Sequence, residues 1–319
     1  MRRILLWMAG NPFLRRNLPR LWFVRRAVRR FMPGEQKEQA LDAAERFHAV
    51  GMGILFTHLG ENLTRIEEAD AVAEHYLELL DEIERRQISG EASIKLTQLG
   101  FDLDRVRTYE HVARLADRSA QIQIANVAGD RRTTRPLDLW IDMEGSAYTE
   151  ATVDLYARLK ESRANTGLCL QAYMMRTYSD IERLLPLEPK IRLVKGAYAE
   201  SPDICFQRRP EVDANYLALC VSMLDALAVG RQIFIGLGTH DVRLIEQVGA
   251  HARERGLPLD AFDVEMLYGI RADEQRRLRD AGYRVRVLIA YGEAWYPWYM
   301  RRLAERPANV AFALRQLLP

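Results

Sequence analysis

Cysteine and long apolar runs are both scarce in this sequence. The three cysteines, Cys169, Cys205 and Cys220, lack metal-ligand spacing and cannot all form disulfides, which favours a reducing compartment. No apolar run is long enough to cross a bilayer. Residues 1–10 resemble a signal peptide, but their apolar core is short, and arginine returns at Arg15 without a small-residue cleavage site. We therefore expect a cytoplasmic protein rather than a secreted one.

Sequence motifs of several large enzyme classes are also missing. No glycine-rich dinucleotide-binding motif opens a helix after the first strand-like run, and residues 236–240 contain only a fragment of one. A nucleophile elbow, a Walker loop and a zinc signature are absent as well. The near-neutral total charge of +2 gives no reason to expect a nucleic-acid partner. Five histidines show no metal-ligand spacing, so we assign them structural roles and expect no metal: His48, His58, His75, His111 and His251.

Acidic residues are absent from residues 1–34, which carry nine arginines and no lysine. The rest of the chain has 37 basic and 44 acidic residues, so a basic leader precedes an acidic body. Residues 11–31 carry an imperfect helical stripe of apolar side chains. Two interpretations stay open: Trp22 and Phe23 anchor the leader on an anionic membrane surface, or the leader packs on the body. We divide the chain into this leader, residues 1–34, and a catalytic domain, residues 35–319.

Apolar strand-like runs alternate with amphipathic helical patterns after the leader. Eight strands are predicted: Gly53–Leu59, Ala92–Leu99, Leu137–Met143, Leu168–Met174, Ile191–Ala197, Gln232–Gly238, Ala261–Met266 and Val285–Tyr291. A capping box of Thr64 with Glu67 opens the first helical pattern. The patterns include Thr64–Arg86, Asp104–Ser119, Thr149–Ser162, Val212–Ala228, Asp241–Glu254 and Ala272–Ala281. Nearly continuous apolar strands, each followed by a helix, favour a closed, TIM-like (β/α)8 barrel of the α/β class with extra N-terminal helices. An open doubly wound sheet is the alternative.

The predicted strand ends are unusually polar, and in this fold catalytic residues gather at the carboxyl ends of the strands. An unpaired buried cation is costly, so several together indicate a polar cavity in which acids balance bases. Asp142 and Glu144 are either an acid–base pair or ion-pair partners of Lys95, and His240 is either functional or a helix cap. Lys195 also fits a Schiff-base lysine, which would make the protein an aldolase-like lyase. The polar strand-end residues are Lys95, Gln98, Asp142, Glu144, Gln171, Tyr173, Arg192, Lys195, Tyr198, Thr239, His240, Glu265 and Tyr268.

The chain closes with a predicted buried strand, residues 283–292, and a predicted helix, residues 293–306. Two neighbouring guanidinium groups on this helix either bind a carboxylate or phosphate, or belong to an ordinary solvated face. From the residues alone we expect a cationic site for a small carboxylate or a phosphate. One helical stripe carries four residues that can act together: Trp298, Arg301, Arg302 and Glu305.

Nine short motifs follow one another along the chain, at predicted strand ends or on the last helix. They are Phe31-Met-Pro-Gly-Glu35, Leu59-Gly-Glu-Asn-Leu63, Ser93-Ile-Lys-Leu-Thr-Gln-Leu-Gly100, Ile141-Asp-Met-Glu144, Leu170-Gln-Ala-Tyr173, Ile191-Arg-Leu-Val-Lys-Gly-Ala-Tyr198, Gly238-Thr-His240, Glu265-Met-Leu-Tyr-Gly-Ile-Arg271 and Arg301-Arg-Leu-Ala-Glu-Arg-Pro-Ala-Asn309. One motif alone is a weak signal. Together, in this order, they resemble the proline dehydrogenase family, flavin-dependent enzymes that oxidise proline to 1-pyrroline-5-carboxylate.

The resemblance implies a distorted barrel that binds FAD non-covalently, with the last helix over the barrel mouth. Lys95, Arg301 and Arg302 are then expected to bind the substrate carboxylate, with Asp142 holding this cationic group and Tyr198 forming a wall of the pocket. Hydride passes from the carbon next to the substrate nitrogen to flavin N5. The residues expected to contact the flavin or order its site are Gln171, Arg192, Lys195, Gly196, Thr239, His240 and Glu305. Because family members commonly pass electrons to membrane quinones, a quinone acceptor and peripheral membrane contact through residues 1–31 are also expected, at the inner face of the cell membrane.

Two positions on the substrate side depart from the family pattern. Leu288 stands where many members have a tyrosine in the last strand, and Trp298 stands where many have a tyrosine three residues before Arg301. With Tyr268 they form the expected substrate pocket. The substrate is expected to be a small carboxylated cyclic amine, either proline or a 4-substituted analogue such as 4-hydroxyproline. No second aldehyde-dehydrogenase domain is recognisable, so we expect a monofunctional enzyme. Interpretations of other classes are the Lys195 lyase and a non-catalytic binding protein that retains the fold.

Overall fold

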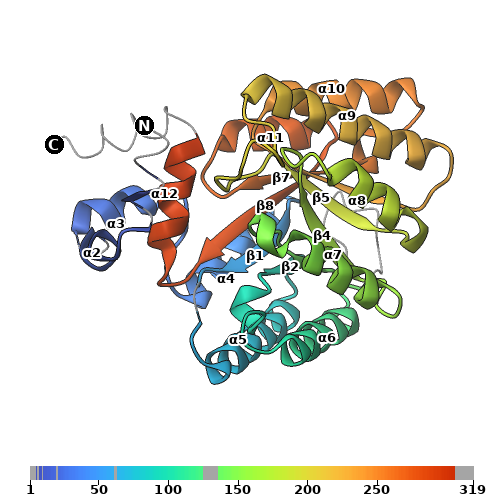
Figure 1. The fold of residues 1–319 in the computed structure, drawn as a ribbon. Coiled ribbons are helices and arrows are strands. Elements are labelled where there is room, and N and C mark those ends of the chain that lie inside the picture. Colours follow the sequence, from blue (N-terminus) through green and yellow to red (C-terminus); the bar gives the residue numbers. More distant parts are fainter. Residues whose placement is uncertain are drawn as a thin grey trace.

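Eight parallel strands form a closed barrel in chain order (Figure 1). The computed structural model describes residues 5, 7–8, 10–18, 21–60, 63–124 and 136–305. The pairing of Gly53–His58 with Arg286–Tyr291 closes the sheet, so the predicted (β/α)8 barrel is confirmed and the open doubly wound sheet is excluded. The strands are β1 (Gly53–His58), β2 (Gly90–Ile94), β3 (Leu139–Ile141), β4 (Thr166–Gln171), β5 (Lys190–Val194), β6 (Phe234–Gly238), β7 (Asp263–Leu267) and β8 (Arg284–Tyr291).

A helix follows every strand of the barrel. The helices that follow the first seven strands bury their apolar faces in one core together with the outward-facing side chains of the strands. No described helix combines the length and the apolarity that a bilayer span requires. The eight helices are α5 (Ile66–Arg85), α6 (Arg105–Gln121), α7 (Ser146–Lys160), α8 (Thr177–Leu184), α9 (Arg209–Ala228), α10 (Val242–Glu254), α11 (Ala272–Asp280) and α12 (Trp295–Glu305).

The eighth helix leaves the outer ring, and an N-terminal helix takes its position. α4 (Lys37–His48) packs against β1 and β8. α12 instead joins a separate apolar cluster that includes Leu59 and Ala290, with Leu267 partly buried against it. Because these three residues lie at or just beyond the carboxyl ends of β1, β8 and β7, α12 lies at the mouth of the barrel. In Figure 1, α12 stands beside α2 (Pro12–Asn17) and α3 (Trp22–Val28), apart from the ring of the other helices.

The leader packs on the body through this same cluster. Leu5, Val28, Phe31 and Met32 are buried in it, and the rings of Phe31 and Tyr299 lie 5.6 Å apart. The sequence indicated one helix-like segment over residues 11–31, whereas the structure has two short helices. Proline at position 19 of the sequence has no N–H with which to continue a helix.

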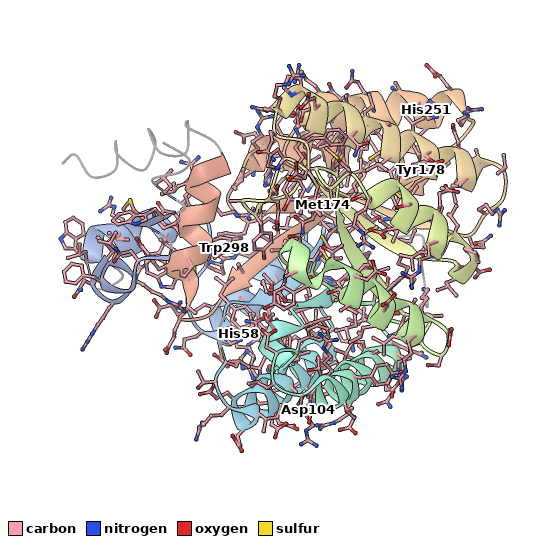
Figure 2. All side chains as sticks on the ribbon, viewed as in Figure 1. His58, Asp104, Met174, Tyr178, His251 and Trp298 are labelled. Atoms are coloured by element: carbon pink, nitrogen blue, oxygen red, sulfur yellow. The ribbon has the colours of Figure 1, made fainter. Side chains whose placement is uncertain are left out.

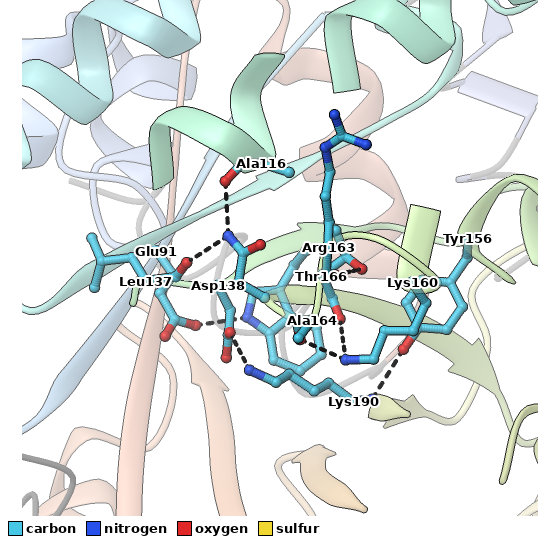
Figure 3. Close-up of polar contacts among 12 residues, drawn as sticks. Glu91, Ala116, Leu137, Asp138, Tyr156, Lys160, Arg163, Ala164, Thr166 and Lys190 are labelled. Atoms are coloured by element: carbon cyan, nitrogen blue, oxygen red, sulfur yellow. Dashed lines mark hydrogen bonds and ion pairs between the residues drawn. The ribbon is translucent and has the colours of Figure 1, made fainter. Parts of the chain in front are cut away.

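The interior of the barrel is charged rather than apolar. At the amino-terminal end Lys190 pairs with Asp138, and Trp140 Nε1 donates to Glu91 Oε2 at 2.7 Å (Figure 3). Arg286 binds both Glu91 and Asp263 in the next layer. Barrels of this kind are commonly filled by branched apolar residues, so these ion pairs replace part of the usual packing.

The predicted capping box and the predicted end of the second strand were wrong. α5 begins at Ile66 with Arg65 as its N-cap, and Glu68, not Glu67, accepts from the backbone N–H groups of Thr64 and Arg65 at 2.8 and 3.3 Å. The second strand ends at Ile94, because residues 97–99 form a 3₁₀ turn closed by Gly100 at φ 94°. This early end places Lys95 at the rim of the barrel.

Candidate active site

Three charged side chains meet at the carboxyl ends of β2, β3 and β5. Lys95 and Asp142 directly follow β2 and β3, and Arg192 lies in β5. Asp142 Oδ1 accepts from Arg192 Nη2 and, at 2.9 Å, from Ser93 Oγ; its Oδ2 lies 3.8 Å from Lys95 Nζ. The three residues come from separate predicted strands, and the barrel brings them together as expected. We call Lys95, Asp142 and Arg192 the mouth triad.

The mouth triad carries more positive than negative charge. Lys95 and Arg192 share the single carboxylate of Asp142. Arg192 is almost fully buried; burial opposes its charge, but Asp142 and Glu265 raise its pKa above the ordinary value, so it stays charged. An anion at this mouth would therefore meet a net attraction.

Glu144 does not form an acid–base pair with Asp142. Its carboxylate accepts from Thr97 N at 3.1 Å and from Thr97 Oγ1 at 2.7 Å. Burial raises the pKa of Glu144 despite these hydrogen bonds. β3 has already ended at Ile141, so the strand alternation that would have placed Asp142 and Glu144 on one face no longer applies.

Lys195 lies at the rim of the barrel rather than at its centre. Its Nζ donates to Asp213 on α9 and, at 3.0 Å, to Asp241 Oδ2 at the start of α10. Burial opposes ionisation of Asp241, but Lys195 and neighbouring arginines lower its pKa overall. This arrangement ties Lys195 to the helices and leaves it outside the mouth triad, which does not favour a Schiff-base lysine.

Four further predicted flavin contacts lie at neighbouring strand ends. Gln171 ends β4 and donates from Nε2 to Glu144 O at 2.7 Å. Thr239 and His240 directly follow β6, and Thr239 Oγ1 accepts from Asp241 N at 3.2 Å. Gly196 has φ 112°, and a Cβ at this position would overlap the ring of Tyr173, so this backbone requires glycine.

The remaining predicted residues divide between the mouth and the helical layer. Leu288 follows Arg286 by two positions, so it faces the same side of β8, inward; it is half-buried and lies outside both apolar clusters. The ring of Tyr268 instead packs edge-on against Phe47 of α4 at 5.9 Å, on the helical side of the barrel. Tyr198, beyond β5, is half-buried.

The expected carboxylate arginines lie on the helix at the mouth. Trp298 is buried in the α12 cluster (Figure 2), and Arg302 is half-buried. The backbones of Arg301 and Glu305 belong to α12, but their side chains lie outside the described part of the structure.

Sequence reasoning gave no site role to Ser93 and left the role of Glu265 open. Ser93 donates to Asp142, and its Oγ also accepts from Arg192 Nη2 at 2.7 Å. The signal that could have found it is the two-residue strand period, which places Ser93 on the same face as Lys95. Glu265 lies beneath Arg192, with Arg192 Nη1 3.5 Å from Glu265 Oε2.

The polar groups at the mouth fit a flavin. Gln171 Oε1 is buried and has no hydrogen-bond partner among the described residues. Such groups are costly unless a bound molecule satisfies them. An isoalloxazine ring offers both donors and acceptors. In the same described ranges no three His, Cys, Asp or Glu side chains gather as a metal site.

Fold and site together define a (β/α)8-barrel protein with a cationic mouth covered by its eighth helix. The sequence profile of the proline dehydrogenase family matches residues 40–315. The chain is 32% identical to proline dehydrogenase 1 of Bacillus subtilis subsp. natto over 318 residues, covering 100% of this chain and 99% of that protein. It is also 32% identical to the proline dehydrogenase of Deinococcus radiodurans, over 91% of this chain and 89% of that protein. The chain therefore belongs to the proline dehydrogenase family, whose members are oxidoreductases.

Solved structures support the same fold. Proline utilization A (PutA) from Bdellovibrio bacteriovorus matches with a TM-score of 0.78 and 20% identity, over 95% of this chain and 38% of that chain. A PutA mutant from Bradyrhizobium japonicum matches with a TM-score of 0.71 and 21% identity, over 92% and 32%. This chain thus spans about a third of the length of those proteins.

Proposed function

We propose that the protein oxidises L-proline to 1-pyrroline-5-carboxylate with FAD, as the first step of proline catabolism. The observation that carries the proposal is the mouth triad, whose two cations share one carboxylate in a chain of the proline dehydrogenase family. An amino acid with a free carboxylate supplies the missing negative charge.

The chain's own residues bind and orient the substrate in this proposal. Lys95, with Arg301 and Arg302 from α12, binds the carboxylate and fixes the position of the ring. Asp142 holds Lys95 and Arg192 in place, and Tyr198 borders the ring. Bound FAD supplies the hydride acceptor at N5.

The cofactor is held by the strand ends in the same proposal. Arg192 would lie beside N5 of bound FAD, where negative charge would develop on reduction. Glu305 orders α12. The other residues proposed to hold the flavin are Gln171, Lys195, Gly196, Thr239 and His240. Protonation of the substrate nitrogen disfavours hydride loss from the carbon next to it. The nitrogen must therefore be neutral, and activity is expected to rise with pH.

The visible absorption spectrum of the purified protein tests this function. We expect a two-banded flavin spectrum that bleaches when proline is added without oxygen. A protein that stays colourless after FAD is supplied would contradict the oxidoreductase proposal and favour the Lys195 lyase. Retained flavin that no cyclic imino acid reduces would favour a non-catalytic binding protein.

A 4-substituted proline is the second candidate substrate, and the inward, half-buried position of Leu288 favours it. Leucine is smaller than the tyrosine of many relatives and leaves more room beside the ring. We expect Leu288→Tyr to lower kcat/KM for 4-hydroxyproline relative to proline by about 10-fold, the usual effect of a small change in pocket volume. Trp298→Tyr, which alters a residue buried in the α12 cluster, is the matched control. An unchanged ratio in Leu288→Tyr would remove this candidate.

Electron transfer to a membrane quinone completes the proposal, with the leader as the membrane contact. Trp7, Phe13 and Trp22 are 64, 72 and 72% exposed although the leader packs on α12, and Arg26, like several other leader arginines, is exposed. Exposed aromatics beside arginines suit an anionic lipid surface.

Point replacements test this contact better than a deletion, since removing residues 1–30 would also remove Val28 from the α12 cluster. We expect Phe13→Ser with Trp22→Ser to abolish sedimentation with anionic liposomes and to spare activity with a soluble dye. Tyr178→Ser, at a 54% exposed aromatic on α8, is the control (Figure 2). Binding that survives the double replacement would show that the leader is not the anchor.

A further inference from the structure

Glu265 is the one acid among the interior ion pairs to which no described residue donates a hydrogen bond. Both of its carboxylate oxygens are buried without a hydrogen-bond partner in the described chain. Its neighbours are satisfied: Glu91 accepts from Trp140 Nε1 and Arg286, and Asp263 accepts from Arg284 and lies 2.6 Å from Arg286 Nε. Buried carboxylates normally have such partners, so this exception calls for an explanation.

The side chain of Glu265 fits a space made for it beside Arg192. Gly236 lies on the neighbouring strand β6, and a Cβ there would be only 2.7 Å from Glu265 Oε1. The nearest cation is Arg192 Nη1, 3.5 Å from Glu265 Oε2. This nitrogen also lacks a hydrogen bond within the described chain. The other terminal nitrogen, Arg192 Nη2, donates to Asp142 and Ser93. One guanidinium group is therefore shared between a carboxylate at the mouth and a carboxyl group inside the barrel.

The inner carboxyl group changes its charge near neutral pH. Burial raises the pKa of Glu265 to about 7, although Arg192 and Arg286 act to lower it. Below this value the group is neutral, and Arg192 is balanced by Asp142 alone. Above it, a second carboxylate offsets the charge of Arg192. The ionisable groups that face Glu265 come from β5, β8, β7, β2 and α9, and they are Arg192, Arg286, Asp263, Glu91 and Tyr216.

We propose that Glu265 is a positioning residue that sets, through its own protonation, how much positive charge Arg192 presents at the barrel mouth. The proposal rests on the proposed function in one respect, namely that a flavin lies against Arg192. Reduction adds negative charge on the mouth side of the guanidinium group and draws it outward. Glu265 then loses part of its counter-charge and binds one proton from solvent, so reduction and proton uptake are coupled.

The midpoint potential of the flavin, measured against pH with redox dyes, tests this coupling. We expect the potential of the wild-type protein to fall more steeply with pH around pH 7. In Glu265→Gln this extra slope disappears, and above pH 7 its potential is more positive than that of the wild type. A tenfold change in the reduction equilibrium corresponds to about 30 mV for a two-electron couple. Parallel curves for the two proteins would overturn the proposal while leaving proline oxidation intact.

Two further variants separate this role from a structural one. Glu265→Asp keeps a titrating group. We expect it to show the extra pH dependence of the midpoint potential that Glu265→Gln lacks, even if it destabilises the barrel. Glu144→Gln removes another buried acid, which binds Thr97 and not Arg192, and is expected to keep the wild-type slope. Loss of the slope in Glu144→Gln would mean that any buried acid gives the effect, which would also overturn the proposal.

Infrared spectroscopy reads the proton on Glu265 without turnover. We expect the wild-type protein to lose a carboxylic-acid carbonyl band between about pH 5 and pH 9, and Glu265→Gln to lack that band. A spectrum without the band at any pH would overturn the proposal whether or not the protein binds flavin. Absence of flavin with the band present would instead point to failure of the proposed function.

Discussion

Lys95 and Lys160 are two buried lysines with different partners. Lys95 Nζ lies 3.8 Å from Asp142 Oδ2 at the mouth. Lys160 Nζ donates to the carbonyls of Ala164 at 2.6 Å and Thr166 at 3.4 Å, at the other end of the barrel (Figure 3). We expect Lys95→Met to lower kcat/KM for proline by roughly 10- to 100-fold, because a hydrogen bond to a charged group contributes about 1.5–3 kcal/mol. Steady-state kinetics measure this loss.

Lys160→Met is the matched control for that substitution. It leaves two carbonyl groups without their shared donor, so we expect a lower Tm with unchanged kcat/KM. If both variants lost catalytic efficiency equally, the assignment of Lys95 to the substrate carboxylate would be wrong.

Strand alternation explains which residues the sequence placed correctly. Lys95, Asp142 and Arg192 could be predicted to meet, because carboxyl ends of parallel strands converge in a barrel. Tyr268 comes three residues after the inward-facing Glu265, an odd spacing, so its ring lies on the outer face against Phe47. Lys195 comes three residues after the inward-facing Arg192 and likewise contacts α9 and α10. Parallel strands that are buried on both faces have no clear alternation of polar and apolar residues, so the sequence alone does not show which residues face inward.

At the scale of elements, sequence patterns alone did not predict that α4, and not α12, fills the place in the outer ring beside β1 and β8. The sequence patterns did not single out the segment of α4, whereas the family resemblance implied that the last helix lies over the barrel mouth. Chain order alone would put the helix after β8 into the outer ring. The structure gives that position to α4 because the aromatic-rich face of α12 finds its apolar partners in the leader. Amphipathic patterns show which face is buried but not against which partner.

Gly269 tests the contact between the leader and the barrel. It has φ 71°, and a Cβ there would overlap the carbonyl oxygen of Arg30. We expect Gly269→Ala to force the end of the leader away from the loop after β7, and so to speed cleavage within residues 1–34 in limited proteolysis. Backbone strain contributes about 1–3 kcal/mol in addition.

Gly282 separates the two effects in Gly269→Ala. It has φ 96°, and a Cβ added there would have no neighbouring atom within 4 Å, so Gly282→Ala carries backbone strain without the clash. We expect this control to lower Tm while the leader remains resistant. Equal cleavage in both variants would show that strain alone, and not the Arg30 contact, governs the leader.

At the scale of the whole molecule, two buried groups make stability depend on pH in opposite directions. Burial lowers the pKa of His58 from 6.5 to about 4, with His75 and Lys95 adding to the effect. Burial raises the pKa of Glu265 from 4.5 to about 7. The unfolded chain binds more protons at His58 between about pH 4 and 6.5, so that group makes stability rise with pH. The folded chain binds more protons at Glu265 between about pH 4.5 and 7, so that group makes stability fall.

These opposite slopes overlap, so each becomes visible only when the other is removed. We expect Glu265→Gln, relative to the wild type, to gain on the order of 2 kcal/mol in unfolding free energy as pH rises from about 4.5 to 7. His58→Gln is expected to show the reverse, a relative loss of similar size as pH rises through its own window, since its acid penalty is gone. Urea unfolding at several pH values measures both differences, and because each is taken against the wild type, the other titrating groups cancel. If neither variant's unfolding free energy, taken relative to the wild type, changed with pH, both pKa shifts would be contradicted. If only the Glu265→Gln difference were independent of pH, Glu265 would stay ionised inside the barrel.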